Sequence, residues 1–363
     1  MSREGQTPDT REPITSGTRS NLVDIVKGIA ILLVVYGHTA QGMVHRGWWP
    51  GPGASYSRTF IYSFHMPAFF FVAGLFVLGS IAKRGNKRFA VDKLKTILYP
   101  YVLFAIIGAA IEPLIGRFKS GTKPFHWDVF LLNLADGEAS WFLFVLFVCL
   151  MLALIVARGP AWLCFLAATL VGMTLSFRSP IINDVLREFC FLAAGMWVGT
   201  RVYRLERMCK GVAATGFVVL AMFQAAAVYL YGSLVLGRWM YIIFGLTGTA
   251  GLFLLARLLD KHRFGDGLAW VGRASLAVFL LSGFPQGATR EVLLRVFHTR
   301  EFRLQLLLPT LFATLLPAIV WYQQDRWRVS WLFQGPFSGD GVEGDGIRNQ
   351  GVLDGISSKG FTP

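Results

Sequence analysis

Residues 21–42 read NLVDIVKGIAILLVVYGHTAQG, and their composition indicates the class of fold. It is almost wholly apolar apart from Asp24, Lys27 and His38. A helix of about 20 such residues is long enough to cross the hydrocarbon core of a bilayer. Further apolar stretches follow along the chain, and the weakest of them is at residues 160–176. We predict membrane-spanning helices at residues 22–44, 60–79, 97–116, 140–157, 160–176, 182–200, 211–231, 238–258, 268–286 and 305–323.

The composition also favours an integral membrane protein. Of the 363 residues, 54% are hydrophobic and 15% are charged, whereas a soluble domain carries about 25% charged residues. The formal net charge of +14 would suggest a nucleic-acid partner in a soluble protein, but this chain has no soluble basic domain to bind one. The four cysteines lack metal-ligand spacing, so we expect no metal. The sequence therefore predicts an all-α, polytopic transmembrane bundle of about ten spans whose partner is the lipid bilayer.

The chain is divided by composition into one apolar domain and two polar tails. Residues 1–20 are predicted to be a polar cytoplasmic N-terminal tail and residues 21–334 the transmembrane domain. Residues 335–363 are rich in glycine and lack a long apolar stretch, so we expect a disordered C-terminal tail.

Basic residues at the ends of the predicted spans indicate the orientation. If the N-terminus is inside, most of the basic runs fall in inside segments, as the positive-inside rule requires. We therefore expect both termini in the cytoplasm. The inside runs lie at residues 83–88, 201–210, 256–263 and 325–328.

One predicted outside segment does not follow this rule. Arg290, Arg295, Arg300 and Arg303 would all lie outside. We expect these residues either to form an amphipathic helix at the membrane interface or to line a site for an acidic group.

Three ionisable residues share one face of the first predicted span. At about 100° per residue, Lys27 and His38 lie about 20° apart around the helix axis, and Asp24 lies about 40° from His38. The rise from Lys27 to His38 is roughly 16 Å. The helix thus presents a carboxylate and a cation near the cytoplasm and an imidazole deeper in the bundle.

Each of these residues has a structural and a functional interpretation. Asp24 and Lys27 suit either an interfacial ion pair, with the lysine reaching towards water, or a functional pair, because ionisable groups inside spans are costly. His38 suits either a hydrogen-bonded packing role or a general base, since imidazole accepts a proton near neutral pH.

Two further segments carry residues that could take part in chemistry. In FHMPAFFFVAG (64–74), Pro67 interrupts the backbone hydrogen bonds beside His65, and Gly74 permits close packing; a kinked aromatic span without chemistry is the alternative. In the following basic segment, Lys93 and Lys95 are either positive-inside residues or ligands for the phosphates of a cytoplasmic donor.

Taken together, these segments resemble the acyltransferase-3 family over roughly residues 20–330. Within that family, the chain is most similar to bacterial sugar O-acetylases of the fucose-acetylase kind, including those that decorate nodulation lipo-oligosaccharides. Two positions depart from the pattern: Lys27 stands where many members have arginine, and Ser282 where many have histidine. The resemblance rests on VDIVKGIAILLVVYGH (23–38), FHMPAFFFVAG (64–74), KLKTILYPY (93–101), SWFLFVLF (140–147) and VGRASLAVFLLSGFP (271–285).

The resemblance implies a membrane-bound O-acetyltransferase of the bacterial inner membrane. Such an enzyme moves an acetyl group from cytoplasmic acetyl-CoA, with no permanently bound cofactor, to a sugar hydroxyl of a surface or secreted glycan such as an exopolysaccharide or lipo-oligosaccharide. It implies His38 as general base, Asp24 as the partner of Lys27, and His65 as a second acceptor-site group. Lys27, Lys93 and Lys95 would bind the CoA phosphates.

Two other classes of function stay open. The first is a transporter or flippase for a glycolipid or an anionic substrate, which would also explain buried charges. The second is a non-catalytic membrane subunit of a polysaccharide export complex.

Overall fold

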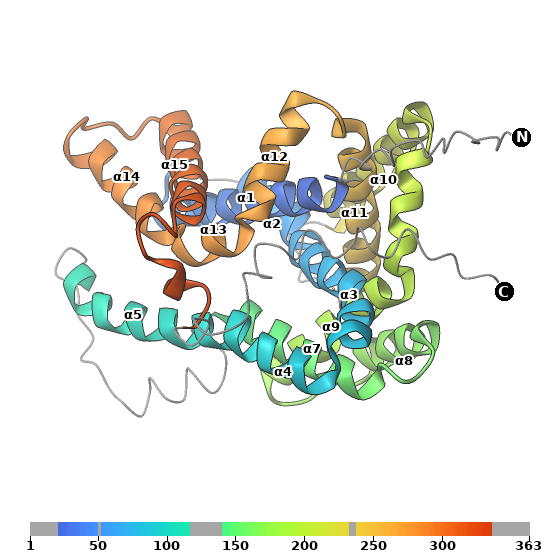
Figure 1. Cartoon of the computed structure of the whole chain (residues 1–363). Coiled ribbons are helices and arrows are strands. Elements are labelled where there is room, and N and C mark those ends of the chain that lie inside the picture. The colour runs from blue at the N-terminus through green and yellow to red at the C-terminus, as the bar shows by residue number, and fades with distance from the viewer. Residues whose placement is uncertain (1–20, 50–51, 117–139, 232–236, 336–363) are drawn as a thin grey trace, which may run out of the picture. The chain divides into compact units, whose positions relative to one another are not determined.

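The computed structural model describes residues 21–49, 52–116, 140–231 and 237–335. Within these ranges every regular element is a helix, which confirms the all-α prediction (Figure 1). The predicted N-terminal tail and nearly all of the predicted glycine-rich tail lie outside the described residues. The elements are α1 (Leu22–His45), α2 (Pro52–Tyr62), α3 (His65–Arg84), α4 (Asn86–Lys93), η1 (Leu94–Leu98), α5 (Tyr99–Gly116), α7 (Trp141–Val156), α8 (Ala161–Thr174), α9 (Pro180–Val198), η2 (Gly199–Arg207), α10 (Lys210–Tyr231), α11 (Arg238–Leu259), α12 (Arg263–Arg273), α13 (Ser275–Leu281), α14 (Gly283–Arg295), α15 (Phe302–Tyr322) and η3 (Ser330–Leu332).

The helices differ in whether they are long and apolar enough to cross a membrane. In the described part of the chain, six helical stretches are long and apolar enough to cross a membrane, or seven if the bent pair α12 and α13 is one span. The predicted number of ten is therefore not confirmed. Helices α7 and α8 are apolar but short, and α8 with 14 residues rises only about 21 Å. Helix α9 carries three charged residues, Asp184, Arg187 and Glu188.

The predicted span at residues 268–286 is not one continuous helix. Helices α12 and α13 meet at Ala274 with a bend of 62°, and α14 starts at Gly283, after the buried Ser282. The apolar run is continuous through this region, so hydropathy alone gives no sign of the bend.

The helix break expected at Pro67 lies a few residues earlier. Helix α2 ends at Tyr62 and α3 begins at His65, so Pro67 falls in the first turn of α3. A proline is tolerated there because the first turn of a helix has no internal partner for its backbone N–H groups.

Helices α4 and α5 continue into each other through the π-helical turn η1. Together they form a candidate span at Asn86–Ile111. Pro100, just after η1, cannot donate a backbone hydrogen bond, and a wider turn next to it accommodates the missing donor. Lys93 and Lys95 therefore flank or belong to an irregular turn, a feature that is frequent at functional sites.

Helix α1 packs against α12, α15 and α3. Glycines allow the closest of these approaches: a Cβ atom at Gly28 would meet the carbonyl oxygen of Leu268, and one at Gly272 would meet that of Asp24. A matching pair, Gly74 and Gly195, brings α3 and α9 together, which confirms the close packing expected at Gly74. Small residues are the usual means of close helix packing in membranes.

Candidate functional site

The first turns of α1 carry an ion pair that a third residue extends. The Lys27 Nζ atom lies 2.7 Å from Asp24 Oδ1, and the Arg273 Nη1 atom lies 3.8 Å from Asp24 Oδ2. Asp24 is buried, whereas Lys27 and Arg273 keep about a quarter of their side-chain surface exposed. One carboxylate thus holds two cations at this end of α1, and the cluster keeps a net positive charge. Sequence reasoning paired Asp24 with Lys27 but missed Arg273.

Arg273 comes from α12 and is fixed by the helix contacts around it. The neighbouring Gly272 lies against the backbone of Asp24. Arg273 Nε also donates a hydrogen bond of 3.2 Å to the Tyr322 hydroxyl, which donates to the Trp270 carbonyl at 3.0 Å. The ring of Tyr322 stacks on that of Trp270. Arg273 is therefore held in place from α12 and α15.

His38 lies on an exposed part of the α1 surface. Among the described residues, no group forms a hydrogen bond with its imidazole. The packing role considered for His38 requires such a bond, so the described contacts do not support it. The ring is accessible and both of its nitrogens are available.

His65 contrasts with His38 because it is buried at the start of α3. Its Nδ1 atom lies 2.7 Å from the carbonyl oxygen of Ile61. A carbonyl only accepts, so Nδ1 carries the proton, and Nε2 of the neutral ring is the acceptor. The Tyr62 ring packs edge-on at 4.9 Å, and the two imidazoles are close enough to interact electrostatically.

Tyr62 connects His65 to the part of α1 that carries His38. Its ring packs over Gly37, and its hydroxyl donates a hydrogen bond of 3.3 Å to the side-chain oxygen of Gln41. Residues 37, 38 and 41 share one turn of α1. The structure therefore brings His38 and His65 into one cluster through Tyr62.

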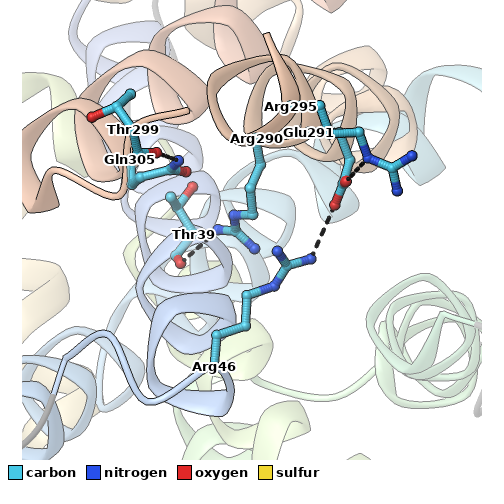
Figure 2. Close-up of polar contacts among 7 residues, drawn as sticks. All are labelled: Thr39, Arg46, Arg290, Glu291, Arg295, Thr299 and Gln305. Atoms are coloured by element: carbon cyan, nitrogen blue, oxygen red, sulfur yellow. Dashed lines mark hydrogen bonds and ion pairs between the residues drawn. The ribbon is translucent and has the colours of Figure 1, made fainter. Parts of the chain in front are cut away.

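Thr39, next to His38, is the centre of a polar network that sequence reasoning missed. The Gln286 side-chain amide donates to Thr39 Oγ1 at 2.6 Å, and Thr310 Oγ1 lies 3.1 Å from the same atom. Arg290 donates to the Thr39 backbone carbonyl at 3.1 Å (Figure 2). Helices α14 and α15 thus fix the turn of α1 that carries His38.

Arg290, from the arginine-rich segment predicted to lie outside, is buried against α1. It belongs to α14 and is 8% exposed, with its guanidinium packed over Gly42 of α1 and its Nε atom without a partner in the described residues. Burial lowers the pKa of Arg290, the charge of Arg46 lowers it further, and Glu291 raises it. Arg290 and Arg295 are five residues apart, about 140° around a helix, which explains why only Arg290 faces α1.

A cavity of about 400 Å³ lies between α1 and α2 beside this network. It is lined on the α1 side by residues flanking His38, although the imidazole itself is not among the lining groups. Aromatic rings and hydrogen-bonding side chains together suit a sugar, which offers both apolar faces and hydroxyl groups. The lining residues include Tyr36, Gly37, Gln41, Trp49, Ser57 and Arg58.

The structure does not join Lys93 and Lys95 to Lys27. The Lys93 Nζ atom pairs with Asp92 Oδ2 at 3.3 Å, and Arg84 reaches the same oxygen at 3.2 Å. Lys95 is exposed. No contact within the described residues links this group to Lys27, so a shared role in donor binding stays a prediction.

A second buried ionic network lies between α9 and α11 and was not recognised in the sequence. Glu188 is fully buried and accepts hydrogen bonds from Arg187 at 3.1 Å and from the Tyr241 hydroxyl at 2.9 Å. Arg187 also pairs with Asp184 at 2.8 Å. Charged residues inside an apolar span were the available signal. Elsewhere in the described residues, no three His, Cys, Asp or Glu side chains gather as a metal site would require.

Comparisons with known proteins give the family of this chain. The family model of the acyltransferase domain matches residues 21–322, so this chain belongs to that acyltransferase family. It is similar to the nodulation protein NolL of Mesorhizobium japonicum, with 24% identity over 300 residues, 75% of this chain and 78% of that protein. NolL of Sinorhizobium fredii is 33% identical over 95 residues, 25% of each chain. No solved structure matches.

Proposed function

We propose that this protein is a membrane-bound O-acetyltransferase that moves an acetyl group from cytoplasmic acetyl-CoA to a sugar hydroxyl of a surface or secreted glycan. Membership of the acyltransferase family supports acyl transfer. The similarity to two nodulation proteins supports a glycan or lipo-oligosaccharide acceptor. The observation that carries the proposal is His38, exposed and without a hydrogen-bond partner in the described residues, on a turn that α14 and α15 fix.

His38 is the general base in this mechanism. Its unprotonated ring nitrogen removes the proton of the sugar hydroxyl as the hydroxyl oxygen bonds to the thioester carbonyl carbon. The carbon–sulfur bond then breaks, and the imidazolium returns the proton to the departing CoA sulfur. A positioned base of this kind contributes about 10²–10⁴-fold to the rate.

The Asp24, Lys27 and Arg273 cluster is the donor side of the site. Guanidinium and ammonium groups bind phosphate oxygens through charge-assisted hydrogen bonds. Asp24 neutralises one of the two cations and holds both in place, which leaves positive charge for the CoA phosphates. Lys93 and Lys95, at the π-helical turn, add to the positive charge at what the basic runs indicate is the cytoplasmic face.

The cavity between α1 and α2 is the acceptor side. Tyr36 and Trp49 offer faces for a sugar ring, and Gln41 and Ser57 offer hydrogen bonds. His65 supports this side indirectly, because its fixed ring orders Tyr62, which in turn holds Gln41.

Acetyl transfer by the purified protein in nanodiscs, with labelled acetyl-CoA and candidate glycans, tests the proposal. His38→Ala, His38→Gln and His38→Asn are expected to lower the rate by about 10²–10⁴-fold, because neither amide accepts a proton at neutral pH. Their melting temperatures are expected to stay within about 2 °C of the wild type, because no hydrogen bond within the described residues is lost. Substantial activity in His38→Gln contradicts the catalytic role.

A transporter or flippase is the second candidate, and the bent pair α12 and α13 favours it, since broken helices line many transport sites. The same preparation separates the two functions. A transporter moves substrate across a proteoliposome membrane without forming an acetyl ester, and an acetyltransferase forms the ester in detergent or nanodiscs, where no second compartment exists.

A further inference from the structure

A second cavity, of about 790 Å³, lies where α1 and α14 end. We call it the arginine cavity. Its volume falls within the range of sites that hold whole small molecules, about 300–1,000 Å³. The lining residues are Arg46, Trp48, Glu291, Leu294, Arg295, His298 and Arg300.

The chain reversal after α14 gathers these cations. The Thr299 backbone N–H donates to the Leu293 carbonyl at 3.0 Å, and His298 takes a left-handed conformation with φ of 49°. This is a usual way to end a helix. It turns the chain so that His298 and Arg300 line the same cavity as Arg295.

One carboxylate, that of Glu291, pairs with two of the three arginines that line the cavity. Glu291 lies 3.3 Å from Arg46 and 3.0 Å from Arg295 (Figure 2), and it is the one acidic residue that lines the cavity within the described ranges. Arg290 precedes Glu291 on α14 but does not line the cavity; it is more than nine-tenths buried, and its Nε atom has no partner in the described residues. Among the described residues, Arg290 and Arg300 form no ion pair with a carboxylate.

The positive charge exceeds what the cavity needs for its own structure. Three guanidinium groups line the cavity with one carboxylate among the described residues, and the carboxyl ends of α1 and α14 each contribute a partial charge of about −0.5. A charge of about +1 remains for these groups after the carboxylate and both helix ends are subtracted. Capping the two helices therefore does not account for all the arginines.

We propose that the arginine cavity binds the phosphate group of a phosphate-bearing sugar acceptor. The excess positive charge favours an anion, and guanidinium groups bind phosphate in a bidentate manner. Residues 44–49 contribute to both cavities, so a phosphate bound here lies close to the cavity between α1 and α2 that takes the acceptor sugar. The inference rests on the proposed acetyltransferase function, because it assigns the acceptor of that reaction.

The position of the cavity separates it from the donor side. From Lys27 to His45, α1 rises about 27 Å, so the arginine cavity and the Asp24 cluster lie near opposite ends of one helix. CoA phosphates bound near Lys27 do not occupy the arginine cavity. The anion bound there belongs to another molecule.

Inorganic pyrophosphate is the probe for this site, used with purified full-length protein in phosphatidylcholine nanodiscs and with saturating CoA to fill the donor side. Calorimetry and thermal unfolding give the readouts. Pyrophosphate is expected to bind and to raise the melting temperature by about 3 °C or more at a hundredfold excess over its Kd. Arg46→Gln and Arg300→Gln are expected to weaken binding by about tenfold or more.

Arg303→Gln is the matched control. Arg303 is exposed, lies three residues after Arg300 and does not line the cavity, so its loss removes the same charge without touching the site. Wild-type affinity in Arg303→Gln supports the proposal. An equal loss in all three variants overturns it, because binding would then follow net charge alone.

Two further results overturn the proposal while leaving the acetyltransferase intact. One is an active enzyme that does not bind pyrophosphate. The other concerns nanodiscs made with phosphatidylglycerol. If these nanodiscs stabilise the protein and abolish its binding of pyrophosphate, the natural anion is a lipid headgroup. A protein that binds pyrophosphate through Arg46 and Arg300 but has no transfer activity gives the opposite result. The phosphate site is then supported, and the proposed function is overturned.

Discussion

Asp24 contacts cations from two helices that are far apart in the sequence. Lys27 lies one turn away on α1, whereas Arg273 comes from α12, 249 positions later in the numbering. Removing either cation leaves the other paired with Asp24. Removing Asp24 leaves two like charges beside each other with no other carboxylate paired to them among the described residues.

Donor binding follows from this arrangement. Lys27→Gln and Arg273→Gln are each expected to raise the KM for acetyl-CoA by about tenfold, since each removes one charge-assisted bond to a phosphate. Lys27→Arg keeps the charge and is expected to stay close to wild type. Steady-state kinetics at varied acetyl-CoA check this.

Lys83→Gln provides the control for that series. Lys83 is exposed at the end of α3, and its side chain forms no ion pair or hydrogen bond within the described residues. A similar rise in KM for Lys83→Gln indicates a general charge effect. An unchanged KM in both Lys27→Gln and Arg273→Gln contradicts a donor role for the cluster.

The residues of the candidate site differ in how far the sequence could predict them. The register of Asp24, Lys27 and His38 follows from helix geometry alone, because all three lie on α1. Arg273 and Arg290 acquire their roles from contacts with another helix. No local sequence pattern indicates such contacts, so only the charge of these two residues was predictable.

At the scale of elements, the contact between α1 and α12 depends on glycine. Gly272 lies against the backbone carbonyl of Asp24, where a side chain cannot fit unless the helices separate. Backbone atoms do not move aside as side chains do. The same contact places Arg273 beside Asp24, so packing and charge pairing are joined in one element.

Gly272→Ala is therefore expected to destabilise the protein by about 1–3 kcal/mol through overpacking. Gly267→Ala is the control: it makes the same change on the same helix, at a position with nothing within 4 Å. It is expected to be neutral or stabilising, because alanine favours a helix by about 1 kcal/mol over glycine. Thermal unfolding in detergent distinguishes them, and equal effects contradict the packing explanation.

Helix existence was predictable, but helix continuity was not. Each apolar stretch chosen from the sequence contains a helix. In a membrane the backbone N–H and C=O groups must bond to each other, because lipid offers no hydrogen bonds, and a helix satisfies them within one segment. The bend at Ala274 and the break before His65 interrupt stretches whose hydropathy is continuous. Those interruptions arise from packing between helices, and hydropathy contains no information about such packing.

At the scale of the whole molecule, Cys209 reports the orientation without a mutation. It is exposed between η2 and α10, whereas Cys149 and Cys190 are buried. Hydrogen bonds from the backbone N–H groups of Gly211 and Val212 lower the pKa of the Cys209 thiol. More of it is therefore thiolate at neutral pH, and the thiolate is the reactive form.

If the basic runs are cytoplasmic, an impermeant maleimide is expected to label Cys209 only after the cells are permeabilised. Cys209→Ser should abolish that signal. In the Cys209→Ser background, Arg178→Cys, at an exposed position between α8 and α9, should label in intact cells. Labelling of Cys209 in intact cells reverses the predicted orientation.

The network around Thr39 also sets an order of events during synthesis. Thr39 and its partner Thr310 are separated by 271 positions, which a ribosome takes on the order of tens of seconds to translate. Until α15 is made, the Thr39 hydroxyl has the carbonyl of Val35 within its own helix as a partner, at 3.0 Å. The nascent chain can therefore wait in the membrane with its first helix inserted, and the turn that carries His38 is completed only when the last helix arrives.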